Sequence, residues 1–156
     1  MTSWMIVEDE PGLYEMLLSM TEIMGVSGLA FANGEEADEW IADVESGVFG
    51  GELPELALLD IRLPGSIDGA MVGARLRACP PLSKMRIFLM TAYKLSPSEE
   101  KEVLQLSGAE TILYKPLPGI DRLSEILTGQ QKPRRRHRTK LNSQPRANTH
   151  DDASQQ

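Results

Sequence analysis

Five short apolar runs alternate along this chain with five stretches that have the period of a helix, and this alternation limits the possible folds more than any other feature. The runs occupy residues 4–7, 28–32, 56–59, 86–92 and 111–117. The residues between successive runs are enough for a right-handed crossover, which joins parallel strands. The run at 56–59 is apolar throughout, as expected for a strand covered on both sides. We therefore expect an α/β fold, a five-stranded parallel sheet with helices on both faces.

The helical stretches carry start and stop signals. In the fourth, Ser96 and Glu99 have the spacing of a capping box, and Pro97 falls at the first helical position. Asp68 is a candidate N-cap for the third, which Pro80 ends. The expected helices cover residues 13–24, 33–46, 68–79, 96–107 and 120–128. The residues of the first that recur at helical spacing, and should face the core, are Leu13, Met16, Leu17, Met20, Ile23 and Met24.

Length and residue types exclude several classes of protein. The 156 residues, 41% of them hydrophobic, suit one globular domain. No apolar run approaches the roughly 18 to 20 residues that span a bilayer, so we expect a cytoplasmic protein with no membrane attachment. The single cysteine, Cys79, excludes an intramolecular disulfide, and His137 and His150 both lie near the C-terminus. A Cys/His zinc site therefore has no ligand set, and any metal must be bound by oxygen.

Charge divides the chain into two parts. Residues 130–156 hold seven Lys and Arg against two Asp, a sum of +5, whereas residues 1–129 hold nine against 21 acids, a sum of −12. We expect residues 1–129 to form the folded domain and residues 130–156 to form a disordered, basic and polar tail. An acidic body repels nucleic acid, and the tail lacks aromatic side chains, so we do not expect a nucleic-acid partner. Docking of the tail on an acidic protein surface is the alternative to a solvated extension.

Chemically distinctive residues end four of the five expected strands. The first strand ends at Glu8 and Asp9, the third at Asp60, the fourth at Thr91 and the fifth at Lys115. In an open parallel sheet, ligands bind beyond the carboxyl ends of the strands, so these side chains should meet in one site. Three carboxylates stay ionised together when they share a hard cation, for which Mg²⁺ is the natural choice. A carboxylate beside such an ion can attack phosphorus, which makes Asp60 a candidate for phosphorylation.

The segments that carry these residues, "VEDEPGL", "LLDIRLPGSIDG", "MTA" and "YKP", resemble the motifs of the receiver (CheY-like) domain of two-component response regulators. The resemblance runs from about residue 4 to residue 127. It implies a flavodoxin-like sheet with strand order 2-1-3-4-5. It also implies that Asp60 accepts a phosphoryl group from a histidine kinase, and that Thr91 and Lys115 contact that group. The Lys115-Pro116 peptide is expected to be cis.

The same resemblance implies how Mg²⁺ would be held. Asp9 and Asp60 would ligate the ion directly, and Glu8 would act through a water molecule. The backbone carbonyl of Arg62 would supply a further ligand.

This sequence departs from the usual receiver pattern at the rim of the site. Ile112 stands where the family usually has an aromatic residue that turns inward on phosphorylation, and the neighbouring Tyr114 is a candidate to substitute for it. The loop "PGSIDG" is one residue longer than the commonest version, which should reshape the rim without removing a ligand. Arg62 and Tyr93 lie where side chains flank the path of attacking water, so we expect a slowly hydrolysed phosphoryl group.

The resulting expectation is a stand-alone receiver that is not an enzyme beyond catalysing its own phosphorylation and dephosphorylation. The 27 residues after Gly129 are too few and too polar to build a second core. Its partners would be a sensor histidine kinase or phosphotransfer protein and a downstream protein target, and a homodimer is possible. The alternative is a pseudo-receiver that binds a partner without phosphorylation. A haloacid-dehalogenase-like phosphatase would need an acid two residues after the nucleophile, where this chain has Arg62.

Overall fold

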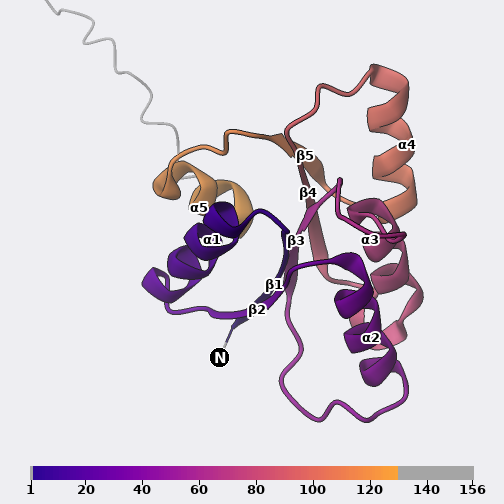
Figure 1. Cartoon of the computed structure of the whole chain (residues 1–156). Coiled ribbons are helices and arrows are strands. Elements are labelled where there is room, and N and C mark those ends of the chain that lie inside the picture. The colour runs from indigo at the N-terminus through magenta and orange to yellow at the C-terminus, as the bar shows by residue number, and fades with distance from the viewer. Residues whose placement is uncertain (1, 130–156) are drawn as a thin grey trace, which may run out of the picture.

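A computed structural model describes residues 2–129, and the expected tail at 130–156 lies outside the described residues. Five parallel strands form one sheet in the order β2-β1-β3-β4-β5, so the expected α/β class and strand order are confirmed (Figure 1). The strands are β1 (Ser3–Val7), β2 (Ser27–Phe31), β3 (Leu56–Asp60), β4 (Arg86–Thr91) and β5 (Thr111–Tyr114). Among residues 2–129, no helix is both long and apolar enough to cross a bilayer.

Helices cover both faces of the sheet. They are α1 (Pro11–Ile23), α2 (Gly34–Glu45), α3 (Gly69–Ala78), α4 (Pro97–Ser107) and α5 (Ile120–Thr128), with a short 3₁₀ helix, η1 (Pro80–Leu82), after α3. Figure 1 shows α1 and α5 on one side and α2, α3 and α4 on the other. The sheet therefore separates two apolar cores, as the unbroken hydrophobicity of the third strand predicted.

Successive side chains of a strand point to opposite faces of the sheet, so a strand contributes residues to both cores. On β1, Trp4 and Ile6 pack with α1 and α5, whereas Met5 and Val7 pack on the side of α2 and α3. Each of these four residues is at most 2% exposed. A strand with a core on each face tolerates few polar residues, so the polar groups of the central strands lie at their ends.

Side-chain caps fix where the helices begin. Asn33, Asp68 and Ser96 each accept a hydrogen bond from the backbone N–H three residues later, which confirms the caps predicted at Asp68 and Ser96. Glu10 caps α1 in the same way and accepts hydrogen bonds from the N–H groups of Gly12 (3.1 Å) and Leu13 (2.7 Å). The start of α1 is thereby set directly after the acids that end β1.

Two expectations about element boundaries and faces are wrong. The fifth strand ends at Tyr114 rather than residue 117, because Pro116 and Pro118 have no N–H to donate to a neighbouring strand. On α1, Leu17 and Met20 are fully buried, but Met16 is 37% and Ile23 is 72% exposed. The apolar stripe on this helix is therefore wider than the surface that the sheet can cover.

Candidate functional site

Three carboxylates meet beyond the carboxyl ends of β1 and β3. Glu8 is fully buried, Asp60 is 4% exposed, and Asp9 is exposed to solvent. One oxygen from each of the three lies within 4.8 Å of the others. Val7 pairs with Leu59 in the sheet, so the two strands end at the same level and bring the acids together. This cluster, with oxygen ligands alone, fits a Mg²⁺ site.

Lys115 joins the end of β5 to this cluster. Its Nζ donates to Glu8 Oε2 at 2.9 Å and to Asp60 Oδ2 at 3.0 Å. Desolvation lowers the pKa of Lys115, but the hydrogen bonds and charges of the two carboxylates outweigh this effect, and the pKa is raised above its ordinary value. The lysine therefore stays charged and offsets part of the repulsion between the acids.

Burial has the larger effect on Asp60. Desolvation raises the pKa of its carboxyl to about 6, with the charge of Glu8 acting in the same direction and the ammonium of Lys115 opposing both. Because burial makes the Asp60 carboxylate costly to ionise, additional positive charge nearby would stabilise its ionised form.

Thr91 lies at the end of β4, beside the phosphoacceptor candidate. It is fully buried, and its Oγ1 accepts a hydrogen bond from the N–H of Tyr93 at 3.1 Å. Its backbone carbonyl accepts from the N–H of Lys115 at 2.8 Å. The sheet register pairs Asp60 with Met90 and Thr91 with Tyr114, so these residues occupy one edge. The Lys115-Pro116 peptide is cis, as expected.

Arg62 and Tyr93 form a contact that the sequence did not predict. The guanidinium carbon of Arg62 lies 3.7 Å from the centre of the Tyr93 ring, a cation–π contact between the β3–α3 and β4–α4 loops. The backbone N–H of Arg62 also donates to Asp60 Oδ1 at 3.2 Å. Tyr93 is 52% exposed and Arg62 is exposed, so both side chains of the pair are accessible to solvent.

Ile112 and Tyr114 project from β5 toward the helices on the side of α4. Ile112 packs against the core shared with α2 and α3. Tyr114 is 38% exposed, and its hydroxyl donates to the carboxylate of Glu100 on α4. This contact, together with desolvation, raises the pKa of the Tyr114 phenol. Tyr114 thus connects the strand that ends at Lys115 to helix α4.

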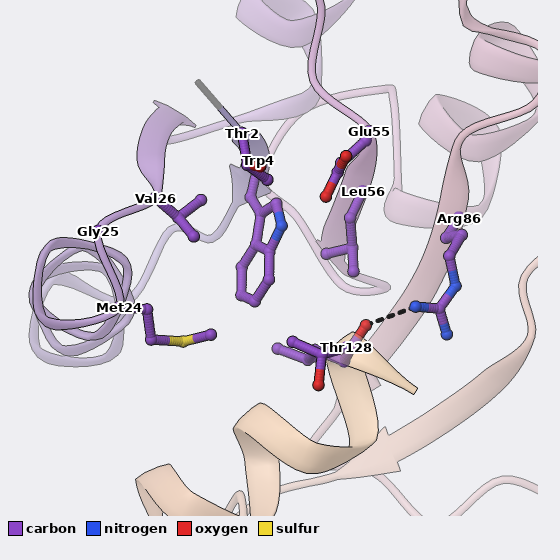
Figure 2. Close-up of a pocket in the computed structure, with 10 residues that line it drawn as sticks. Thr2, Trp4, Met24, Gly25, Val26, Glu55, Leu56, Arg86 and Thr128 are labelled. Carbon is purple, nitrogen blue, oxygen red and sulfur yellow. Dashed lines mark hydrogen bonds between the residues drawn. The ribbon is translucent and has the colours of Figure 1, made fainter. Parts of the chain in front are cut away.

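A cavity of about 630 Å³ lies at the opposite, amino edge of the sheet, between α1 and α5 (Figure 2). Arg86 lines it, and all three guanidinium nitrogens already donate, to the carboxylate of Glu110 and to the backbone carbonyl of Leu127. Trp4 also lines it, with an indole N–H that is buried and lacks a hydrogen-bond partner within residues 2–129. The cavity brings together no group of the carboxylate cluster.

The comparisons with known proteins point to one family. The chain matches the family model of the response regulator receiver domain over residues 4–128. No curated protein sequence matches the chain. The signal receiver domain of a modulated diguanylate cyclase from Desulfovibrio desulfuricans G20 is 27% identical, with a TM-score of 0.64, over 81% of this chain and 90% of that chain.

Two further solved structures are similar. The BeF3-activated N-terminal receiver domain of RstA from Klebsiella pneumoniae is 26% identical, with a TM-score of 0.62, over 80% of this chain and 95% of that chain. The receiver domain of the sensor histidine kinase PA1611 from Pseudomonas aeruginosa PAO1, which has a magnesium ion coordinated in its active-site cleft, shares the fold at 24% identity, with a TM-score of 0.66 over 82% of this chain and 95% of that chain. Because the family match extends from the first strand to the last helix, this chain belongs to the response regulator receiver domain family.

Proposed function

We propose that this receiver domain accepts a phosphoryl group on Asp60 from the phosphohistidine of a sensor histidine kinase or phosphotransfer protein. The observation that carries the proposal is the pairing of one ammonium, that of Lys115, with the carboxylates of both Asp60 and Glu8. An ion pair that only stabilises the fold needs a single carboxylate for its lysine. Two buried carboxylates around one lysine, with Asp9 adjacent, form a site that has room for further positive charge and an anionic ligand.

Mg²⁺ is the proposed cofactor of this site. Asp9 and Asp60 would hold it directly, Glu8 would act through water, and the backbone carbonyl of Arg62 would complete the protein ligands. The donor set fits, because every member is an oxygen and the carboxylates already lie within reach of one another. When bound, the ion would neutralise charge on the carboxylates and on the incoming phosphoryl group.

The proposed reaction is a phosphoryl transfer between two side chains. An oxygen of Asp60 forms a bond to phosphorus while the phosphorus–nitrogen bond of phosphohistidine breaks, and the imidazole nitrogen keeps the electron pair of that bond. Lys115 and the Thr91 hydroxyl would bind the phosphoryl oxygens, because they end the strands on the same side of Asp60. The domain would act as a phosphoacceptor rather than as an enzyme on other substrates.

The lifetime of the product would depend on Arg62 and Tyr93. The two side chains contact each other, and the backbone of Arg62 is bonded to Asp60. The pair would therefore obstruct water approaching the acyl phosphate. We therefore propose slow self-hydrolysis.

Signal output would pass through protein contacts. Tyr114 links β5 to α4 through Glu100, so a change at Lys115 can reach the α4–β5–α5 surface without the aromatic residue that Ile112 replaces. A downstream protein or a second copy of the chain would bind this surface. The proposal includes a cytoplasmic location, because a histidine kinase draws its phosphoryl group from ATP.

Intact-mass measurement tests the proposal. The full chain would be incubated with Mg²⁺ and either acetyl phosphate or phosphoramidate, beside Asp60→Asn and a sample with EDTA. We expect one Mg²⁺-dependent phosphoryl adduct, absent from the variant. A folded wild-type protein that takes no adduct from either donor would instead indicate the phosphorylation-independent binding module.

A further inference from the structure

The second half of the loop that follows Asp60 is held by a residue of helix α2. Oε1 of Glu35, in the first turn of α2, accepts hydrogen bonds from the Ser66 N–H at 2.8 Å, the Ser66 hydroxyl at 3.2 Å and the Ile67 N–H at 3.2 Å. Chiefly through the Ser66 backbone hydrogen bond, the pKa of Glu35 is lowered, so the acceptor is charged at neutral pH. Hydrogen bonds to a charged acceptor are stronger than those between neutral groups.

The loop and the start of α2 lie so close together at this contact that two positions have space only for glycine. Gly65 has a φ of +88°, and a Cβ at that position would lie 2.5 Å from Glu35 Oε1. A Cβ on Gly34, the first residue of α2, would lie 2.2 Å from the carbonyl oxygen of Ile67. Glycine at both positions therefore lets the start of α2 and the loop pack directly against each other.

Backbone hydrogen bonds fix the two ends of the loop, one to β4 and one between the ends themselves. The Ile61 N–H donates to the carbonyl of Met90 at 2.8 Å, and the Gly69 N–H donates to the carbonyl of Ile61 at 2.9 Å. The residues between these points include Arg62, and the resemblance to receivers implies that the loop is one residue longer than the commonest version. A longer loop has more conformations to lose when it is ordered, and the contact with Glu35 falls in its second half.

We propose that Glu35 is a positioning residue of the phosphorylation site. This inference rests on the proposed function, since it concerns the residue whose carbonyl would bind Mg²⁺. Glu35 touches none of the reacting groups. It acts by holding Ser66 and Ile67, which restricts the loop and thereby the Arg62 backbone, whose N–H already donates to Asp60 Oδ1. The loop and the Glu35 carboxylate that holds it therefore act as one structural unit.

The test compares Glu35→Ala and Glu35→Gln with Glu39→Ala, which removes the same charge from an exposed position on the same helix. Isothermal titration calorimetry of the full chain would measure the Kd for Mg²⁺ alone. Loss of groups that orient metal ligands commonly weakens metal binding by about tenfold or more. We expect about a tenfold higher Kd for Glu35→Ala, an intermediate value for Glu35→Gln, whose amide oxygen accepts the same N–H groups without charge, and the wild-type value for Glu39→Ala.

A second readout separates positioning from folding. At saturating Mg²⁺, the maximal rate of phosphorylation by acetyl phosphate should return to within about twofold of wild type in Glu35→Ala, while the Mg²⁺ concentration at half-maximal rate stays raised. An unchanged Kd in Glu35→Ala would overturn the inference and leave the proposed function intact. A wild-type protein that binds no Mg²⁺ would overturn the proposed function itself.

Discussion

Asp60→Asn is expected to stabilise the fold, and by an amount that depends on pH. Asp60 has its pKa raised from 3.8 to about 6, so ionising it costs more in the folded than in the unfolded chain. Stability is therefore lost as the pH rises from about 4 to about 6. One pKa unit corresponds to about 1.4 kcal/mol, so the penalty is small at pH 4, between about 1 and 2 kcal/mol at pH 5 and about 3 kcal/mol at pH 7. Asparagine removes the charge and the penalty with it.

Urea unfolding followed by tryptophan fluorescence would measure this difference, because Trp4 and Trp40 are both buried. Wild type and Asp60→Asn would be compared at pH 4, 5 and 7 in EDTA, so that the titration of groups that do not interact with Asp60 cancels in the difference. The expected excess stability of the variant grows with pH by about 2 kcal/mol or more. Adding Mg²⁺ should reduce this excess stability, because the ion would stabilise the wild type, which keeps the Asp60 carboxylate that the variant lacks. A constant difference across this pH range, or a variant less stable at pH 7, would refute the reasoning.

Four other single substitutions test separate parts of the structure. Lys115→Met leaves two buried carboxylates without their cation and should cost about 3 kcal/mol of unfolding free energy in EDTA, measured by urea unfolding, with part of the loss restored by Mg²⁺. Arg62→Ala and Tyr93→Ala should each shorten the phosphoryl lifetime in a mass-based decay assay, and the double variant should decay no faster than the faster single one, because both act through one contact. Gly69→Ala would put a Cβ 2.0 Å from the carbonyl oxygen of Asp60 and should lower the melting temperature by roughly 5 °C or more.

The fold and the centre of the site could be predicted because both are local in the sequence. Each strand is a short apolar run; Asp60 and Thr91 are the last residues of their strands, and Lys115 directly follows its strand. Parallel pairing then places strand ends at one edge, so the convergence of these side chains needs no information about packing. The caps at Asp68 and Ser96 were predictable for the same reason, since a capping residue lies beside the helix that it begins.

What the sequence did not predict depends on distance along the chain or on how much surface a neighbour covers. Glu35 lies 31 residues before Ser66, and the Arg62–Tyr93 contact joins two different loops. The periodicity of helices and strands in a sequence does not predict which distant residues come into contact. The exposure of Ile23 has another cause, because helical spacing predicts which side of α1 is apolar but not how far the sheet extends beneath it.

The Arg86 contacts give the two edges of the sheet unequal mechanical roles. At the amino edge, the first residue of β4 is bound to Glu110, just before β5, and to the last turn of α5. None of these groups belongs to the carboxylate cluster, so the proposed phosphorylation of Asp60 would leave this attachment in place. At the carboxyl edge, Lys115 ties β5 to β1 and β3, and its partners include the proposed phosphoacceptor. Under the proposed function, a change at Asp60 would therefore alter the attachment of β5 at its carboxyl end while Arg86 keeps its amino end fixed.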